Sequence, residues 1–400
     1  MRFPGFHKKW ETKKLGEIGE IVNGLTYNPN DINENGVLVL RSSNVQNRTI
    51  TLEDNVYVNS NSFNPVKEND ILICVRNGSR NLIGKNALIK KEHEGLAFGA
   101  FMSIYRSQHN KFLFQWFDTV QYKEIVNKNL GATINSINGS DLKKFEVPFP
   151  EIEEQNKIAQ FLSLIDDRIQ TQNKIIENLE SQIKSLQEKI FKREQKFRNS
   201  NGESYSDWQP KKLGEIGQTF NGLTGKTKED FGAGKSFIQY KQIFDSSKIQ
   251  IEGCGYVNVL VNEAQNTVKF GDVFFTVSSE TPNEIGMSSV LLNEVNELYL
   301  NSFCFGYRPN SLNIINPKYA RYYFRSKVFR GKITKLAQGS TRYNMSKTEL
   351  MKLEIQLPSL DEQIRISESL EAIDDKIQIE NDVLKKYMLQ KKYLLKNLFI

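Results

Sequence analysis

Apolar residues recur in an alternating four-three rhythm between Ile158 and Ile190, and Gln172 is the only polar residue at a seam position. A period of 3.5 residues is typical of a helix that packs against another helix. The same rhythm returns between Ile366 and Leu398, where Glu380 and Lys391 interrupt it. The sequence therefore predicts two long helices. The first, from 151 to 197, would form a rod about 70 Å long, which suits a spacer better than the core of one small domain.

The two predicted helices match each other closely. A shift of 208 residues places Gln172 on Glu380, so both seams break at the same heptad position. Two equivalent helices at the ends of two equivalent halves are predicted to pack antiparallel about a pseudo-two-fold axis. A polar pair in the seam would fix the register at some cost in stability. The alternative is two unrelated coiled-coil helices, and the matching breaks weigh against it.

The remainder of the chain is also a repeat. Residues 10–26 recur as residues 208–224, with 12 of 17 positions identical, including a tryptophan and three glycines. Each half continues with a buried strand (69–75 and 271–277), a Tyr-Arg pair (105–106 and 307–308) and an aromatic-rich helix (112–128 and 318–335). Proline then ends a short strand before each long helix, and Ser359 with Glu362 fits a capping box.

These patterns predict an α+β protein of two similar mixed α/β domains, joined by two long helices that form an antiparallel coiled coil. The predicted segments are a first globular domain at 1–150, a spacer helix at 151–198, a second globular domain at 199–358 and a distal helix at 359–400. The polar stretch 198–207 is predicted to be a linker.

Charge and composition narrow the class of protein. The chain carries a net charge of +7, and the two globular blocks, 1–150 and 201–360, each contribute +4 from 19 basic and 15 acidic residues. This excess favours polyanion binding, although proteins without a nucleic-acid partner show similar values. There is no apolar run long enough for a membrane span and no secretory signal at the start, so a cytoplasmic protein with reduced cysteines is expected.

No catalytic constellation is found in the sequence. Two Gly-Lys-Thr/Ser segments, at 225–227 and 234–236, lack the glycine that a phosphate-binding loop needs five residues earlier. The histidines and cysteines show no metal-ligand spacing, and no cofactor fingerprint is present. A duplicated chain without an active site is predicted to be a recognition or scaffold protein. No catalytic and no metal-binding residue is assigned.

The predicted helix at 318–335 carries a basic face in which aromatic residues are interleaved. Such a face grips the phosphate backbone of DNA in one interpretation and is a solvated helix face in the other, and the sequence does not choose between them. The basic residues assigned to phosphate contact are Arg321, Arg325, Lys327, Arg330 and Lys332.

The order of blocks, the repeated Trp…Lys-Lys-Leu-Gly-Glu-Ile-Gly, and the helix openings Pro-x-x-Glu-Glu-Gln and Pro-x-x-Asp-Glu-Gln with Ile-Asp-Asp resemble the specificity subunits of type I restriction–modification enzymes. The resemblance implies that each globular block is a target recognition domain for one half of a bipartite sequence in double-stranded DNA. It implies that the helices set the half-site spacing and dock two methyltransferase subunits. Restriction subunits would join that core.

The resemblance also implies where the chemistry lies. S-adenosylmethionine, ATP and Mg would belong to the partner subunits, which methylate adenine and cleave DNA, and no cofactor belongs to this chain. The helices and the repeated Leu-Gly-Glu-Ile-Gly segments are expected to bind the methyltransferase. The residues assigned to this subunit interface are Gln155, Asp166, Asp167, Gln363, Asp374 and Asp375.

DNA-reading residues are predicted in polar turns that follow strands and differ between the matching halves. Arginine suits guanine, Asn or Gln suits adenine, and Glu suits cytosine. The candidates in the first half are Arg41, Ser42, Asn44, Arg76, Asn77, Ser79 and Arg80. Those in the second half are Tyr240, Lys241, Gln242, Ser278, Ser279, Glu280, Thr281, Arg342, Tyr343 and Asn344. The alternative for each is that it only satisfies the backbone of its turn.

Two other functions are alternatives to DNA recognition. A coiled-coil scaffold without nucleic-acid binding needs no positive globular domains, so the +4 on each block argues against it. A fused restriction–modification enzyme needs catalytic motifs within this chain. The bases read and the spacer length do not follow from the sequence.

Overall fold

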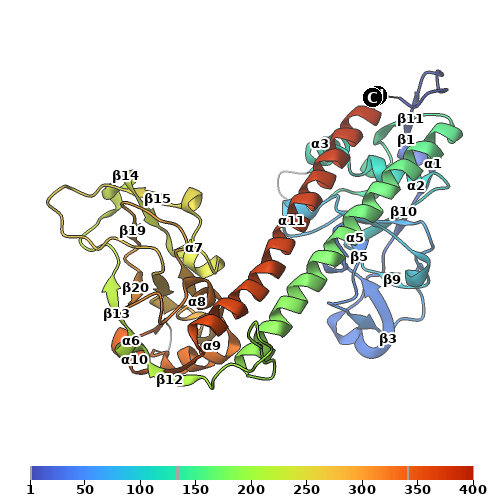
Figure 1. Ribbon diagram of the computed structural model, residues 1–400. Coiled ribbons are helices and arrows are strands. Elements are labelled where there is room, and N and C mark those ends of the chain that lie inside the picture. Colours follow the sequence, from blue (N-terminus) through green and yellow to red (C-terminus); the bar gives the residue numbers. More distant parts are fainter. Residues whose placement is uncertain (1, 131–134, 340–341, 400) are drawn as a thin grey trace. The chain divides into compact units, whose positions relative to one another are not determined.

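The computed structural model describes residues 2–130, 135–339 and 342–399. It contains two compact units (Figure 1): unit 1 comprises Met1–Lys174 with Asp382–Ile400, and unit 2 comprises Ile175–Asn381. This division differs from the four predicted segments because each long helix buries its two ends in different units.

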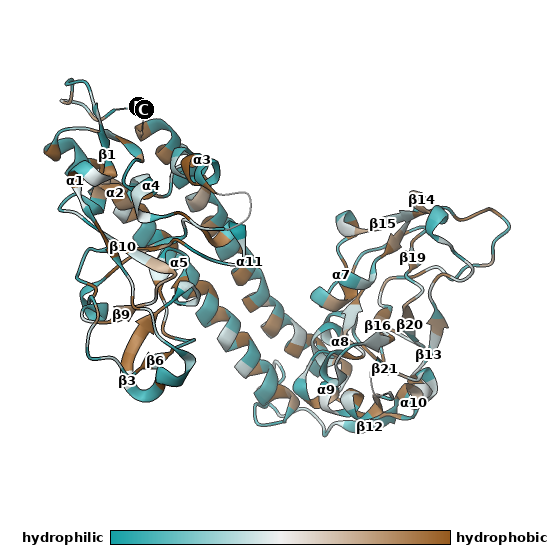
Figure 2. Cartoon of the chain, turned by 180° about the vertical axis from the view of Figure 1, so that it is seen from behind, coloured by the Kyte–Doolittle hydropathy of each residue, from teal (hydrophilic) through white to brown (hydrophobic). Residues whose placement is uncertain are grey.

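The two long helices are α5 (Ile152–Phe191) and α11 (Leu360–Leu398). In unit 1, Ile158 and Leu162 near the start of α5 share a core with Leu394 and Leu398 near the end of α11. In unit 2, the end of α5 shares a core with the start of α11, through Ile183, Ile190, Ile366 and Leu370. Within each unit the start of one helix thus packs with the end of the other, which confirms the antiparallel pairing. Polar and apolar residues alternate along both helices (Figure 2).

The two polar residues of the seam lie in different units. Gln172 is buried in unit 1, and Glu380 is half-buried in unit 2. Their pairing stays a prediction.

Unit 1 is built around a four-stranded antiparallel sheet of order β2-β10-β7-β8. The sheet forms because alternating or continuous apolar residues fill its strands, and β7, the predicted buried strand, is buried throughout. The elements are β1 (Glu11–Lys14), α1 (Leu15–Ile18), β2 (Glu20–Asn23), β3 (Ile32–Leu40), β4 (Val45–Gln46), β5 (Thr49–Ile50), β6 (Tyr57–Val58), β7 (Ile71–Cys74), β8 (Asn86–Leu88), β9 (Ala97–Phe98), β10 (Met102–Arg106), α2 (Asn110–Trp116), α3 (Val120–Asn129), α4 (Gly139–Leu142) and β11 (Glu146–Phe149).

Unit 2 repeats this plan with the sheet order β13-β20-β16-β18. The predicted strand at 271–277 is β16, and its four residues are buried like those of β7. The elements are β12 (Gln209–Lys212), α6 (Leu213–Ile216), β13 (Gly217–Asn221), β14 (Phe231–Ile238), α7 (Tyr240–Asp245), β15 (Gly255–Val257), β16 (Val273–Thr276), β17 (Ser278–Ser279), β18 (Ser288–Val290), β19 (Tyr299–Leu300), β20 (Cys304–Pro309), α8 (Pro317–Tyr323), α9 (Lys327–Ile333), β21 (Tyr343–Asn344), α10 (Lys347–Lys352) and β22 (Glu354–Leu357).

Smaller sheets complete each unit in the same way. The strand that opens each repeat pairs with the strand that precedes the long helix, β1 with β11 and β12 with β22. A second small sheet joins a long strand in parallel to a two-residue strand, β3 to β9 and β14 to β19. The internal repeat predicted from the sequence therefore extends to strand order and register.

Each predicted aromatic-rich helix is in fact two short helices. The first is divided into α2 and α3, and the second into α8 and α9. The division arises because Thr119 and Ser326 cap a new helix: their hydroxyls accept the backbone N–H groups of Tyr122 and Phe329 at 3.2 Å.

The repeated tryptophan binds the first turn of the long helix in each unit. Trp10 donates its indole N–H to Glu154 at 2.9 Å, and Trp208 donates to Glu362 at 3.0 Å. Because Glu362 binds the indole, its carboxylate does not complete the predicted capping box, and only the Ser359 hydroxyl caps the helix, at 3.4 Å. The same contact therefore ties the start of the repeat to the long helix in both units.

The Tyr-Arg pairs are structural in both units. Tyr105 and Tyr307 donate their hydroxyls to the backbone carbonyls of Leu15 and Leu213 at 2.9 and 3.0 Å. Each following arginine makes two hydrogen bonds to one buried aspartate, Arg106 to Asp70 and Arg308 to Asp272.

Two of the repeated glycines are required by close backbone approach. A Cβ at Gly24 would overlap the carbonyl of Gly99, and one at Gly222 would overlap the carbonyl of Asn301. Glycine is therefore needed at both positions because there is no space for a side chain.

Within residues 2–130, 135–339 and 342–399, none of the helices has the length and apolar character that a bilayer crossing requires. In this described part of the chain, no cluster of three or more His, Cys, Asp or Glu side chains is placed to hold a metal ion. Burial raises the pKa of the Cys74 and Cys254 thiols to about 11, so both remain protonated at neutral pH.

Candidate nucleic-acid interface

Four segments of unit 1 meet where the chain leaves β7. The Val75 N–H donates to the Phe101 carbonyl at 3.0 Å, and the Val75 carbonyl accepts from the Ile137 N–H at 2.9 Å. The Asn77 amide donates to the Ser42 hydroxyl at 3.0 Å. These contacts join residues 41–44, 76–80, 99–101 and 135–137, which we call the first candidate surface.

The equivalent segments of unit 2 meet where the chain leaves β16. The Val277 N–H donates to the Phe303 carbonyl at 3.1 Å, and the Val277 carbonyl accepts from the Met345 N–H at 2.9 Å. Strand β17 pairs with β21, and the Tyr240 hydroxyl donates to the Ser278 carbonyl at 2.8 Å. Residues 240–242, 278–281, 301–303 and 342–344 form the second candidate surface. The structure thus brings together segments that the sequence could only place separately after strands.

Several predicted reading residues are exposed on these surfaces. In the first, the Arg76 guanidinium lies 5.7 Å from the centre of the Phe101 ring, and Arg80 makes one hydrogen bond, to the Asn127 carbonyl at 3.3 Å. Exposed charged and polar side chains of this kind are able to reach base edges. The exposed candidates are Arg76, Ser79, Arg80, Lys241, Glu280, Thr281, Arg342 and Asn344.

Asn44 and Ser279 are corrections to the predicted set because both are buried. The Asn44 amide donates to the Thr51 carbonyl, and its side-chain oxygen accepts from the Arg41 N–H at 2.9 Å. The Ser279 hydroxyl donates to Glu284 at 3.2 Å. For these two residues the alternative holds: their side chains satisfy their own loops.

Other candidates are partly engaged within the unit. Arg41 forms an ion pair with Asp54 at 2.8 Å, and Gln242 donates to the Gln250 carbonyl at 2.8 Å. Tyr240, Lys241 and Gln242 lie on helix α7 rather than in the predicted turn. The half-buried candidates are Arg41, Ser42, Asn77, Tyr240, Gln242, Ser278 and Tyr343.

The structure removes Arg321 and Arg325 from the predicted phosphate contacts. Arg321 is 8% exposed and pairs with Asp374 at 2.5 Å. Arg325 donates to four backbone carbonyls, those of Ile243, Phe244, Ser246 and Ser288, and burial lowers its pKa to about 10. Arg321 thus holds α8 against α11, and Arg325 holds the turn after α8 against residues 243–246 and β18, so neither the phosphate contact nor the solvated face describes them.

The other three basic residues of this region differ in exposure. Arg330 donates to the carbonyls of Gly286 and Asn283, and burial lowers its pKa. Lys332 donates to the Glu354 carbonyl at 2.5 Å. The Lys327 side chain is 77% exposed and pairs with Glu188 at 2.5 Å, so it is the most accessible of the five for a phosphate.

Four of the six residues assigned to the subunit interface are used inside the units. Gln155 and Gln363 are buried and donate to the carbonyls of Pro150 and Pro358. Asp166 accepts from Gln115 and pairs with Lys391, and Asp374 pairs with Arg321. Asp167 and Asp375 are exposed and remain candidates for a partner contact.

Sequence reasoning missed Phe101 and Phe303. Their side chains are 57% and 62% exposed, and they occupy equivalent positions, 202 residues apart, on the two candidate surfaces. The signal was the shared Phe-x-x-x-Tyr-Arg that ends in the Tyr-Arg pairs. The prediction of base reading covered only polar turns, so it did not include these two aromatic residues.

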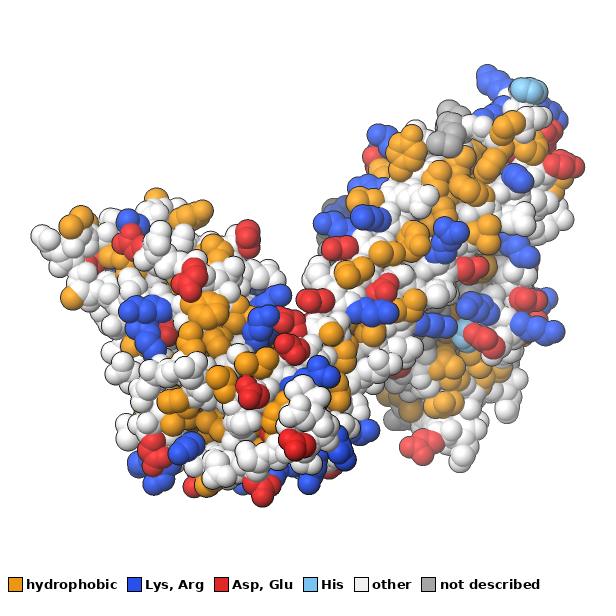
Figure 3. Space-filling model, in the orientation of Figure 1, with side chains coloured by type: hydrophobic (Ala, Val, Ile, Leu, Met, Phe, Trp, Pro, Cys, Tyr) orange, Lys and Arg blue, Asp and Glu red, His pale blue; other side chains and the backbone are white. Residues whose placement is uncertain are grey.

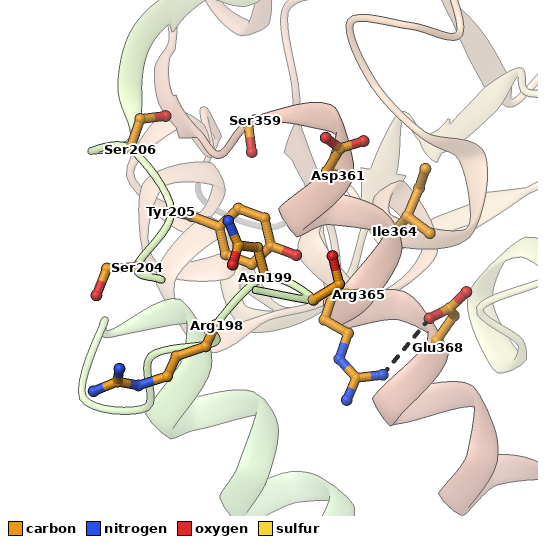
Figure 4. Close-up of a pocket in the computed structure, with 11 residues that line it drawn as sticks. Arg198, Asn199, Ser204, Tyr205, Ser206, Ser359, Asp361, Ile364, Arg365 and Glu368 are labelled. Atoms are coloured by element: carbon orange, nitrogen blue, oxygen red, sulfur yellow. Dashed lines mark ion pairs between the residues drawn. The ribbon is translucent and has the colours of Figure 1, made fainter. Parts of the chain in front are cut away.

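An open hollow of 680 Å³ lies beside the first turns of α11 in unit 2 (Figure 4). The linker 198–206 forms one wall, and Asp361, Ile364, Arg365 and Glu368 of α11 form the other. Arg365 and Glu368 face each other at 4.0 Å. Its charges are mixed and none of the predicted reading residues lines it, so it is not part of either candidate surface.

Residues 7–181 and 205–386 each match the type I restriction modification DNA specificity domain. The chain belongs to this family. The two matches follow the internal repeat, so the protein is a type I specificity subunit with two DNA-recognition domains.

Individual relatives cover nearly the whole chain. It is 27% identical to the putative type I restriction enzyme MjaX specificity subunit of Methanocaldococcus jannaschii, over 93% of this chain and 88% of that protein. It is 22% identical to the type I restriction enzyme EcoKI specificity subunit of Escherichia coli K12, over 91% and 82%. The crystal structure of a type I S subunit from M. genitalium has the same fold, with a TM-score of 0.58, 17% identity and coverage of 100% and 97%.

Proposed function

We propose that each unit reads one half of a bipartite sequence in double-stranded DNA, unit 1 through the first candidate surface and unit 2 through the second. The observation that carries this proposal is that equivalent backbone segments converge in both units while their side chains differ. Residues 76–80 are Arg-Asn-Gly-Ser-Arg, whereas residues 278–282 are Ser-Ser-Glu-Thr-Pro. A kept framework with changed side chains suits two readers of different base sequences, because specificity comes from side chains that reach base edges.

We further propose that the long helices dock two methyltransferase subunits and set the half-site spacing. Large apolar side chains remain exposed on α11, including Ile379 at 62%, Met388 and Leu389 at 57% and Tyr393 at 60%. Basic, acidic and apolar side chains are intermixed over the helices (Figure 3). Exposed apolar residues on a helix support a protein partner, since helix faces are commonly buried against other helices.

The proposed complex supplies the chemistry. In it, the methyltransferase subunits would modify adenine with S-adenosylmethionine, and restriction subunits would use ATP and Mg to translocate and cleave DNA. This chain would contribute recognition and assembly, without catalytic residues of its own.

The test of DNA reading is the double variant Arg76→Ala, Arg80→Ala. Each lost bidentate arginine contact should cost roughly 1–3 kcal/mol and should relax the first half-site alone. The measurement is fluorescence anisotropy with a duplex that carries the selected site, compared with duplexes altered in one half-site. The control is Lys8→Ala, Lys9→Ala, which removes the same charge from exposed positions outside the first candidate surface. Equal loss at both half-sites, or full retention, would contradict the proposal.

Partner docking is tested by reversing charge at Asp167 and Asp375, since both are exposed. Reversal at Asp166 or Asp374 would instead break contacts inside a unit. Asp167→Lys with Asp375→Lys should weaken assembly by roughly 0.2–1 kcal/mol for each surface pair lost. Native mass measurement across a concentration series reports the effect, with Glu94→Lys and Glu252→Lys as controls in the globular blocks. A complex that keeps its full two-to-one mass at every concentration would exclude these residues.

A further inference from the structure

Phe101 and Phe303 expose an aromatic ring at the same place in both units. Each is the last residue of the turn that leads from a two-residue strand into a central strand of the sheet, β9 to β10 and β19 to β20. Their side chains are 57% and 62% exposed, whereas Met102 and Cys304, the next residues, are buried. Over the described residues, neither ring belongs to a packed core cluster of its unit.

The backbone beneath each ring is fixed by hydrogen bonds. The Phe101 carbonyl accepts from the N–H groups of Val75 and Arg76 at 3.0 and 3.1 Å, and the Phe303 carbonyl accepts from Val277 at 3.1 Å. The Phe303 N–H also donates to the Asn301 side chain at 2.8 Å. The ring is therefore held outward on an ordered turn that directly supports the predicted reading loop.

The fold itself does not require phenylalanine at this turn. The bonds that hold the turn come from backbone atoms, so most side chains would permit them. The neighbouring loops differ between the units, Arg76 standing where unit 2 has Ser278, yet the ring is kept. A ring kept on a surface whose polar residues have changed indicates a contact that is shared by both units and independent of the sequence read.

Building on the proposed function, we propose that Phe101 and Phe303 each stack on a base at a partly opened step of their half-site. Base faces are apolar and planar, and every base offers one, so stacking suits a contact that both units share. Apolar wedges of this kind open base steps in other DNA-binding proteins. In unit 1 the Arg76 guanidinium, 5.7 Å from the Phe101 ring, would lie beside the opened step and reach its base edges.

The experiment uses the full chain, assembled with its partner subunits, and a duplex that the wild-type protein selects from a randomised pool. 2-Aminopurine is placed at successive positions, because its fluorescence rises when it is unstacked. Apart from the adenine that the methyltransferase takes out of the stack, the wild-type protein should raise the fluorescence at one further position in each half-site. Phe101→Ala should abolish the rise in the first half-site alone and Phe303→Ala in the second alone. Each variant should bind about 5- to 150-fold more weakly, the loss expected for one stacked base.

Ring shape distinguishes stacking from general apolar contact. Phe→Trp at either position should keep the affinity of the wild type, whereas Phe→Leu should lose it, because an aliphatic wedge opens a step but offers no ring to stack. Val120→Ala and Leu260→Ala are matched controls, because these side chains are 56% and 64% exposed in the same units but lie outside the candidate surfaces. Both controls should behave as wild type.

The outcomes separate this inference from the proposed function. If the wild-type complex selects no sequence, the proposed function fails, and the stacking role fails with it. If it selects a site and the alanine variants bind and unstack that site as the wild type does, the stacking role alone is overturned. If the alanine variants instead reduce the mass of the complex, the rings are protein contacts and the inference is also overturned.

Discussion

Replacing Lys391 with methionine is expected to destabilise unit 1 by about 3–5 kcal/mol, the cost of removing one partner from a buried ion pair. Lys391 interrupts the apolar seam of α11 and is 7% exposed. Its ammonium group lies 2.7 Å from Asp118 and 2.6 Å from Asp166. One side chain thus joins the end of α11 to α5 and to the turn between α2 and α3. Without it, Asp118 keeps Arg48 and Lys123 as cationic neighbours, whereas Asp166 loses its ion pair at a half-buried position.

The pH dependence of stability gives a second readout of the same site. Burial alone would raise the pKa of Asp118, but Arg48 and Lys391 hold it at about 2. This lies below the usual value of about 3.9 for an unfolded chain, so the stability it contributes is complete above about pH 4 and is lost as the pH falls towards 2. The Lys391→Met variant should therefore lose less stability between pH 4 and pH 2 than the wild type.

Denaturant unfolding, with hydrogen exchange of the unit 1 amides as the readout, measures both the loss of stability and its pH dependence. Lys392→Met is the matched control, because Lys392 is exposed on the same helix. If Lys391→Met costs no more than this control, the ion pairs do not stabilise unit 1.

The sequence predicted the long helices and the strands well, and it did so for a physical reason. Heptad spacing and buried apolar runs are local patterns, so Ile158–Ile190 and β7 could be assigned without knowledge of their partners. Lys391 appeared only as a break in the seam, because Asp118, which binds it, lies 273 residues away. The division of the aromatic helices was missed because a single hydroxyl, that of Thr119 or Ser326, decides it within an otherwise helical run.

The candidate site was predicted less completely than the fold. Divergent loops after matching strands located Arg76 and Arg80, which are exposed. The same reasoning included Asn44, whose burial depends on contacts with the Thr51 and Asp54 carbonyls that no periodicity reveals. Arg321 and Arg325 were assigned to phosphate contact because a basic helix face suits the DNA backbone, with a solvated face as the alternative. Here, however, a carboxylate and four carbonyls of unit 2 surround them.

Exchanging residues 199–358 for the corresponding block of a relative is expected to change the second half-site completely and to leave the first unchanged. The block contains the whole second candidate surface, and the reading residues proposed there would act only on the DNA that this surface contacts. Each mismatched base pair costs roughly 1–3 kcal/mol, so even a few changed reading residues should redirect the second half-site entirely. Methylome sequencing of cells that carry the chimaera measures the result directly.

The structure sets the conditions for a stable chimaera. The contacts that join the exchanged block to the long helices within unit 2 include Trp208 with Glu362, Arg321 with Asp374, and Lys327 with Glu188. A donor that keeps the tryptophan and the arginine should fold, whereas one that lacks both would leave two carboxylates unpaired and unfold unit 2. The reciprocal exchange of residues 1–150 is the control and should alter the first half-site alone. In a chimaera of 199–358 the first candidate surface is identical to that of the parent. A change in the first half-site would therefore refute the assignment of one half-site to each unit.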